Sequence, residues 1–167
     1  MTKPDIPPAH GAKQECEQLM GQLLPFAETM LAEHGEFLPF GGVLKMAGEM
    51  AHIGAWDDAE APLSRELIAL LKDGFIAGAR SGQYKATALL YNASTTPPGA
   101  TDSTEAVVIS LNHRDGYSVV VVFPYTVIEG CVEFGDGFAQ AGENDIFPQR
   151  SESNPLPWQR VTSWLRR

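Results

Sequence analysis

The sequence predicts a single α+β domain, in which an antiparallel sheet of about five strands packs with two main helices and a short C-terminal helix. Three observations predict this class. The 167 residues suffice for one domain with a sizeable core. Apolar residues recur with helical spacing in three segments, and five other segments have the composition and alternation of strands. Short turns containing glycine join two pairs of these strands, as in antiparallel hairpins.

Residues 13–34 are predicted to form the first helix. Their apolar side chains follow three-and-four spacing, and Gly35 stands where a left-handed cap would end the helix. Pro25 lies inside the segment and removes one backbone donor, which predicts a kink or two shorter helices. Residues 1–12 carry three prolines and lack the apolar stretch of a signal peptide, so we interpret them as a flexible arm and expect a cytoplasmic protein.

Residues 36–58, EFLPFGGVLKMAGEMAHIGAWDD, are predicted to form a hairpin with MAGE as its turn. Gly48 supplies the positive φ that tight hairpin turns require. A two-residue turn would pair Gly41 with Gly54, and a three-residue turn would instead pair Gly42 with Gly54. Either register places two glycines side by side, so that a helix, a second subunit or a ligand would approach the bare backbone.

Alternation then divides this hairpin into two faces. The first face is predicted to be core and carries Leu38, Phe40, Leu44, Ala51, Ile53 and Ala55. The second face carries Pro39, Gly41, Val43, His52, Gly54 and Trp56. The glycines of the second face fit close packing, or the floor of a pocket whose walls are His52 and Trp56. We favour packing.

The second helix is predicted over residues 62–82, with a proline in its first turn. Three glycines follow each other at four-residue spacing, at Gly74, Gly78 and Gly82, which would let this helix lie close to the glycines of the hairpin. Its buried stripe is predicted to consist of Leu63, Leu67, Leu70, Leu71 and Phe75.

Three further strands are predicted at residues 84–93, 105–113 and 117–125. The sequence RDG makes a hairpin turn between the last two, and His113 beside it is interpreted as part of a solvated tip. Both faces of this hairpin are apolar and need cover, which helices or a second subunit would supply. One face is predicted to carry Val107, Ile109, Leu111, Val120 and Val122, and the other Val108, Val119, Val121 and Phe123.

The remaining residues are predicted to leave the sheet. Residues 127–134 either continue it or depart from it, so the core domain is taken as residues 13–134. Residues 135–167 read as an extended tail rich in Gly, Asn, Pro and Ser. Near its end, a short helix is predicted to dock on the core through Trp158, Val161, Trp164 and Leu165.

The order of these elements is helix, two strands, helix, three strands and terminal helix. It resembles the arrangement of profilin-like and roadblock-like small α+β proteins, although no residue motif of those families is matched. The segments PFG early and HRDGYSVVVVFPY late are similar to those of a family of small uncharacterised bacterial proteins. That resemblance implies a fold and no known activity.

Composition restricts the partners. The net charge of −9 and pI near 4.8 argue against nucleic acid, which requires clustered Lys and Arg. The chain has no apolar run long enough to cross a bilayer, so no membrane is expected. Cys16 and Cys131 lack metal-ligand spacing and are expected to be reduced core thiols. No cofactor and no metal site are predicted, because nucleotide-binding and calcium-loop motifs are absent from the sequence.

The sequence favours a non-catalytic protein-interaction or regulatory module, with a protein partner or a homodimer. The alternative is a small-ligand binder or enzyme whose pocket lies on the glycine face of the first hairpin, with His52 as acid or base. No catalytic residue is assigned, because the histidines are scattered and no nucleophile motif is present. The candidate ligand or partner residues are Gly41, His52, Gly54, Trp56, Asp57, Asp58 and Tyr125.

Overall fold

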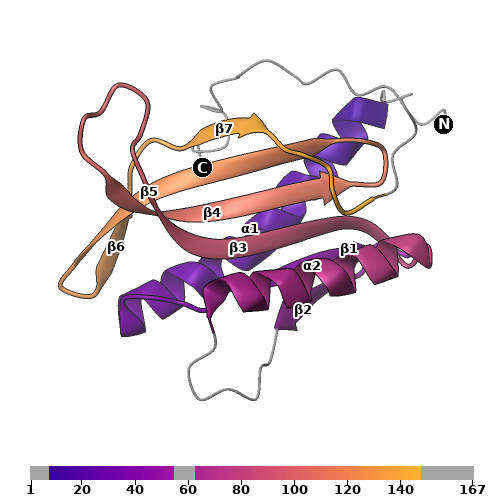
Figure 1. Cartoon of the computed structure of the whole chain (residues 1–167), viewed down its shortest axis with the longest axis horizontal. Coiled ribbons are helices and arrows are strands. Elements are labelled where there is room, and N and C mark those ends of the chain that lie inside the picture. The colour runs from indigo at the N-terminus through magenta and orange to yellow at the C-terminus, as the bar shows by residue number, and fades with distance from the viewer. Residues whose placement is uncertain (1–7, 55–62, 148–167) are drawn as a thin grey trace, which may run out of the picture.

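The computed structural model describes residues 8–54 and 63–147, which form two helices and one seven-stranded antiparallel sheet (Figure 1). The strand order is β2-β1-β3-β4-β5, and both β6 and β7 pair with β5. The predicted C-terminal helix lies outside the described residues. The elements are α1 (Pro8–His34), β1 (Phe40–Lys45), β2 (Met50–Gly54), α2 (Ser64–Arg80), β3 (Tyr84–Thr95), β4 (Thr104–His113), β5 (Ser118–Ile128), β6 (Cys131–Phe134) and β7 (Phe138–Ala141).

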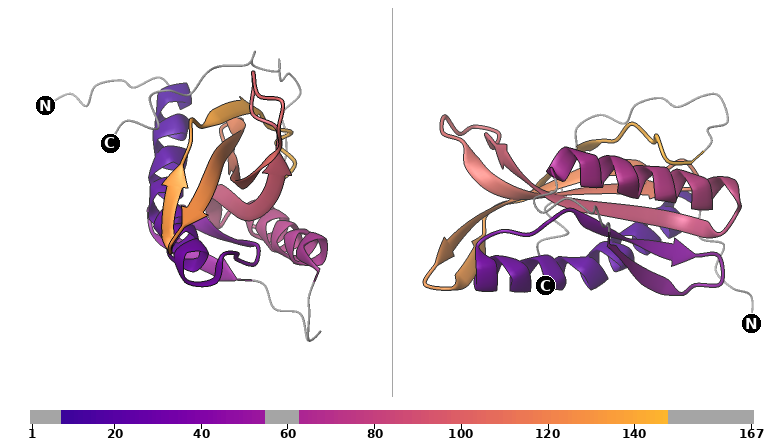
Figure 2. Two further views of the ribbon diagram at one scale, coloured as in Figure 1. Left: turned by 90° about the vertical axis from the view of Figure 1, so that its left-hand side faces the viewer. Right: turned by 60° about the horizontal axis from the view of Figure 1, so that its bottom comes forward.

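The two helices lie on opposite faces of the sheet (Figure 1, Figure 2). The helix α1 contacts β1, β3, β4 and β6, whereas α2 contacts β1 and β3. The larger hydrophobic cluster lies under α1, and a smaller one lies under α2. This arrangement confirms the α+β class. Neither of the two described helices is long and apolar enough to span a membrane.

The helix α1 begins at Pro8, five residues before the predicted start, and runs as one helix through Pro25. Of the two predicted outcomes, a kink or two shorter helices, the second is therefore wrong. The proline ring faces the carbonyl of Gly21, and both residues are exposed, so water can bind the carbonyl that loses its helical partner. At the other end Gly35 has a φ of 76° and donates its N–H to the Leu31 carbonyl, which confirms the predicted cap.

The sheet has seven strands rather than five, because the outer edge of β5 is shared by two short strands. The strand β5 runs to Ile128, and a turn with positive φ at Glu129 and Gly130 folds β6 back along it. The first half of β5 pairs instead with β7, which lies in the segment predicted to be tail. Ile146 and Phe147 are buried, so the packed domain extends beyond the predicted boundary at residue 134.

The first hairpin forms where predicted, but its register differs from both predicted pairings. Lys45 donates a backbone hydrogen bond to Glu49 across a three-residue loop in which Gly48 has a φ of 100°. The hairpin therefore pairs residues of equal parity, namely Phe40 with Gly54, Gly41 with Ile53, Gly42 with His52, Val43 with Ala51 and Leu44 with Met50. No two glycines face each other in this hairpin.

This one-residue difference moves the side chains of β2 to the opposite face from the predicted one. Ala51 and Ile53 pack with Val43 under α2. His52 instead shares the α1 face with Phe40. The predicted division of the hairpin into a core face and a glycine face is therefore wrong for β2.

Gly41 and Gly42 point to opposite faces of β1. At each of them the missing side chain lets a residue of one helix approach the strand closely. A Cβ atom on Gly41 would lie 2.7 Å from the Phe75 ring of α2 and would also collide with the Ala88 carbonyl oxygen. A Cβ atom on Gly42 would lie 2.7 Å from a methyl group of Leu23 in α1. The predicted approach of the second helix to the hairpin glycines is confirmed at Gly41, where Phe75 makes the contact.

Two leucines predicted to be buried in α2 are exposed. Leu63 is 50% exposed and Leu70 is 48% exposed, because Leu63 precedes the first helical residue and Leu70 lies on the outer side of the helix. The buried side chains of α2 are Leu67, Leu71 and Phe75.

The glycines of α2 do not form one packing stripe. Gly78 packs against the Tyr84 ring, which leaves no room for a Cβ atom. No described atom lies within 4 Å of the Cβ position of Gly74. Gly82 lies beyond the helix with a φ of 75° and reverses the chain into β3.

The strands β3, β4 and β5 and the turn at residues 114–116 confirm the predicted elements. The faces of β5 are reversed relative to the prediction, because His113 and Tyr117 enclose a three-residue loop and residues of equal parity again pair. The α1 face therefore carries Val107, Ile109, Leu111, Val119, Val121 and Phe123, and the α2 face carries Val108, Val120 and Val122.

Candidate functional site

His52 lies on the edge strand β2, where its ring belongs to an aromatic cluster on the α1 face. The ring stacks on Phe40 with centroids 4.9 Å apart and an interplanar angle of 29°. It meets the edge of Phe26 of α1 at 4.7 Å and 90°. Phe40 is buried, but Phe26 is 43% exposed and His52 is exposed. Offset and edge-to-face contacts of this kind hold aromatic rings in defined positions, so the exposed surfaces of Phe26 and His52 are preorganised.

Partial burial in this cluster lowers the pKa of His52 below the ordinary histidine value of 6.5. The folded state therefore takes up a proton on His52 less readily than the unfolded state does. The resulting loss of stability develops as the pH falls below 6.5 and is absent well above it, where His52 is neutral in both states. At neutral pH the ring is uncharged and offers an aromatic surface.

An NMR titration of the His52 ring is expected to give a midpoint below 6.5. Replacing Phe26 with alanine removes an aromatic ring that shields His52 from water, so the midpoint should move back toward the ordinary value. Phe37→Ala is the matched control, because Phe37 contacts Phe40 and not His52. A midpoint unchanged by Phe26→Ala would contradict this account of the pKa.

In the described part of the chain, β2 pairs with β1 alone and forms one edge of the sheet. The hydrogen bond from Lys45 to Glu49 fixes the alternation of the ladder, so the odd-numbered residues of β2 bond to β1. The N–H and C=O groups of Met50, His52 and Gly54 then point away from the sheet. With the exposed side chains of Phe26, Met50 and His52, these backbone groups form what we call the β2 edge surface.

The other predicted site residues are not all gathered there. Gly41 is buried beneath Phe75, so it does not line a surface. Gly54 ends β2, and no described atom lies within 4 Å of its Cβ position. The predictions for Trp56, Asp57 and Asp58 lie outside the described residues.

Tyr125 is buried on β5, away from the edge strand. Its hydroxyl accepts a hydrogen bond of 2.6 Å from the side-chain amide of Asn92 on β3, and the Asn92 carbonyl accepts one of 3.2 Å from the Phe37 N–H. Burial raises the pKa of Tyr125, and the charge of Glu105 raises it further. The hydroxyl is therefore neutral and ties the start of β1 to the centre of the sheet.

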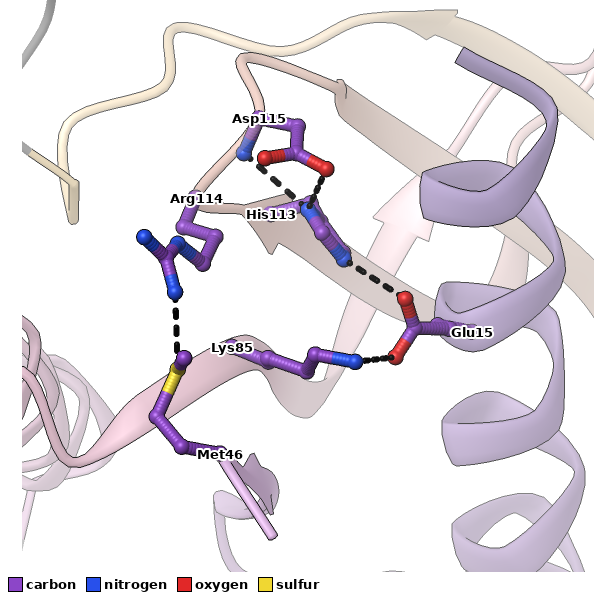
Figure 3. Close-up of polar contacts among 6 residues, drawn as sticks. All are labelled: Glu15, Met46, Lys85, His113, Arg114 and Asp115. Atoms are coloured by element: carbon purple, nitrogen blue, oxygen red, sulfur yellow. Dashed lines mark hydrogen bonds and ion pairs between the residues drawn. The ribbon is translucent and has the colours of Figure 1, made fainter. Parts of the chain in front are cut away.

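A second polar cluster, which the sequence did not suggest, surrounds His113 at the end of β4 (Figure 3). The side chain of His113 is 1% exposed, so the prediction of a solvated tip is wrong. Its Nδ1 accepts a hydrogen bond of 3.0 Å from the Asp115 N–H, so the ring donates from Nε2. That nitrogen donates to Glu15 Oε1 of α1 at 3.4 Å, and Glu15 Oε2 accepts from Lys85 Nζ at 3.0 Å.

This cluster joins α1 to β3 and β4. The neighbouring hairpin tips are joined as well, since the Arg114 guanidinium donates to the Met46 sulfur at 3.0 Å (Figure 3). The Arg114 backbone N–H also donates to the Lys85 carbonyl. A general base must reach the proton that it abstracts, and the His113 ring is buried against protein. The arrangement therefore positions α1 and two hairpin turns, rather than presenting a reactive ring.

The prediction of two reduced core thiols is correct for Cys16 and wrong for Cys131, which is not in the core. Cys16 is buried and Cys131 is exposed, and both are free. Burial raises the pKa of Cys16, and the charges of Glu15 and Glu17 raise it further, so the thiol stays protonated and unreactive. The described residues contain no group of three or more His, Cys, Asp or Glu side chains arranged to hold a metal ion.

Comparison of the chain with protein-family models, with curated proteins and with solved structures found no match. The functional assignment therefore depends on the chemistry of these surfaces.

Proposed function

We propose that this chain is a non-catalytic protein-interaction module, and that an extended segment of a protein partner adds to the sheet along β2. The observation that carries the proposal is the outer edge of β2, with which no described strand pairs, beside exposed, preorganised aromatic rings. Unpaired edge strands are templates for another strand, and natural proteins usually protect them with charge, proline or a bulge. The strand β2, MAHIG, carries none of these.

Backbone and side chains would contribute separately to such binding. The outward N–H and C=O groups of Met50, His52 and Gly54 supply the ladder hydrogen bonds of an added strand. Met50 and Phe26, 36% and 43% exposed, flank His52 and offer apolar surface to alternate side chains of the partner. Aromatic residues held in place before binding lose little conformational freedom, which favours affinity.

The charge of the chain favours a basic partner. Its net charge is −9, and acidic residues lie on both sides of β2 in the sequence, at Glu49 and at Asp57, Asp58 and Glu60. Opposite charge accelerates encounter and disfavours acidic competitors. We therefore expect the bound segment to alternate apolar residues with Lys or Arg.

Selection of a random-peptide display library on the immobilised full chain tests this proposal. We expect enriched peptides that alternate apolar and basic residues. Replacing His52 with alanine removes the ring and should weaken their binding about tenfold, the effect of losing one well-placed aromatic side chain. His52→Pro also removes the outward N–H, at a position where an edge strand tolerates proline, and should weaken binding by about a further tenfold.

The matched control is Leu70→Ala, which removes an exposed apolar side chain from the helix on the other face of the sheet. It should leave binding unchanged. Equal binding by the unsubstituted chain and His52→Pro, in protein whose circular dichroism is unaltered, would contradict the proposal. A dimer in sedimentation equilibrium that His52→Pro dissociates would identify the partner at this edge as a second copy of the chain.

A further inference from the structure

Neither described helix contributes a side chain to one apolar part of the sheet. On the α2 face, strand side chains gather into a second hydrophobic cluster beside the one under α2, and Tyr91 packs against both. We call it the β4–β5 patch. It consists of Tyr91, Ala93, Ala106, Val108, Val120, Val122 and Phe138.

Every described member of this cluster belongs to the sheet itself, from β3, β4, β5 and β7. The helix α2 lies instead over β1 and β3, nearer the other edge. Yet Val108 and Val122 are only 7% and 6% exposed. A single sheet layer does not exclude water from its own outward face, so an apolar face of this kind requires a second layer.

The described chain ends on this same face of the sheet. After β7, the Asn144 N–H donates a hydrogen bond of 3.0 Å to the Ser118 hydroxyl oxygen on β5, and Asp145 forms an ion pair with Lys72 of α2 at 2.9 Å. Ile146 and Phe147 are then buried in the cluster under α2. The described chain therefore ends at Phe147 beside α2, on the face that carries the β4–β5 patch.

We propose that the last residues of the chain form a helix that covers the β4–β5 patch, with Trp158, Val161, Trp164 and Leu165 against the sheet. Residues 148–154 span at most about 25 Å when extended, which suffices to reach the neighbouring strands. A helix over residues 157–165 is about 14 Å long and covers about three strands at their spacing of ~4.8 Å. The sheet would then carry helices on both faces along its whole width.

Charge complementarity supports this occupant. Residues 148–167 contain four Arg and one Glu, a net charge of +3. The other residues contain eight Lys or Arg and 20 Asp or Glu, a net charge of −12. Attraction between the two parts favours contact of the last segment with its own chain.

Quenching of tryptophan fluorescence by acrylamide tests the proposal in the full-length chain. Trp56→Phe leaves Trp158 and Trp164 as the two remaining tryptophans. We expect quenching about threefold weaker than in the urea-unfolded chain, because docking buries both rings. Val120→Lys and Phe138→Lys, at half-buried positions of the patch, should each restore most of that quenching.

Two further variants separate docking from folding. Val161→Lys changes only the last segment, so it cannot disturb the sheet, and it should restore quenching as Val120→Lys does. Ile128→Lys, at an exposed position of β5 outside the patch, should have no effect. Circular dichroism verifies that each variant is folded.

Three results would overturn the proposal. The first is acrylamide quenching of Trp158 and Trp164 in folded Trp56→Phe protein that is as strong as in the urea-unfolded chain. The second is protection that persists in folded Val120→Lys and Phe138→Lys, which would place the segment elsewhere. The third is protection that disappears on dilution, which would make the segment of a second copy the occupant.

Discussion

Replacing Gly41 with alanine is expected to lower the free energy of unfolding by about 3 kcal/mol. The added Cβ atom would lie 2.7 Å from the Phe75 ring and would collide with the carbonyl oxygen of Ala88. A ring can rotate away, but a carbonyl in the ladder between β1 and β3 can move only if the strands separate. The substitution therefore forces apart the sheet and the helix that covers it.

Urea denaturation measures the stability of Gly41→Ala against that of two matched glycine substitutions, Gly42→Ala and Gly74→Ala. Gly42→Ala meets the methyl groups of Leu23, the flexible end of a side chain, so its cost should be smaller than that of Gly41→Ala. Gly74→Ala adds a methyl group on the exposed side of α2, with no described atom within 4 Å, and should stabilise the protein by about 0.5–1 kcal/mol. Equal stability of Gly41→Ala and the unsubstituted chain would contradict the described packing of β1.

Replacing His113 with alanine is expected to cost about 3 kcal/mol of unfolding free energy, because it leaves a cavity where a fully buried ring stood. It also removes the hydrogen-bond partners of the Asp115 N–H and of one Glu15 oxygen. Both effects act where α1 meets β3 and β4.

His34→Ala is the control for this prediction, since His34 is exposed in the last turn of α1, and it should change stability by about 0.5 kcal/mol or less. Glu15→Gln keeps the hydrogen-bond acceptor for His113 and loses the charge that faces Lys85. The unfolding free energy that it costs should therefore lie between the losses in His113→Ala and His34→Ala. A thermal or urea midpoint of His113→Ala equal to that of His34→Ala would contradict the role assigned to the buried ring.

The elements that the sequence predicts with accuracy are those with a local signal. Helical spacing and the left-handed Gly35 define α1, and alternation between turns containing Gly48 and Gly116 defines the hairpin strands. The strand β7 has only four residues, FAQA, between glycines, so its pairing with β5 depends on distant contacts that no local pattern records.

Both errors in the predicted faces have one physical cause. Each of the two hairpins closes with a three-residue loop and so pairs residues of equal parity, whereas the predicted faces grouped residues of opposite parity across each hairpin. Because strand side chains alternate with a period of two, one extra loop residue exchanges the faces of the second strand. The sequences MAGE and RDG contain the glycine that both loop lengths require, so composition does not distinguish them.

The candidate site was predicted in part. His52 does lie on an exposed strand. Phe26, whose ring holds the His52 ring in place, belongs to α1, and β1 lies between α1 and β2 in the chain. Gly41 and Tyr125 are buried and serve packing. The contact of His113 with Glu15 joins residues 98 positions apart, a separation that periodicity and motif spacing do not report.

Amide hydrogen exchange along β2 tests the central claim, strand addition at this edge, most directly. In the free protein, the amides of Ala51 and Ile53 bond to β1 and should exchange slowly, whereas those of Met50, His52 and Gly54 should exchange quickly. Saturation with a peptide selected from the library should slow the three outward amides about tenfold or more, because each outward group gains a ladder partner. Unchanged exchange at Met50, His52 and Gly54 in the peptide-saturated protein would contradict the account.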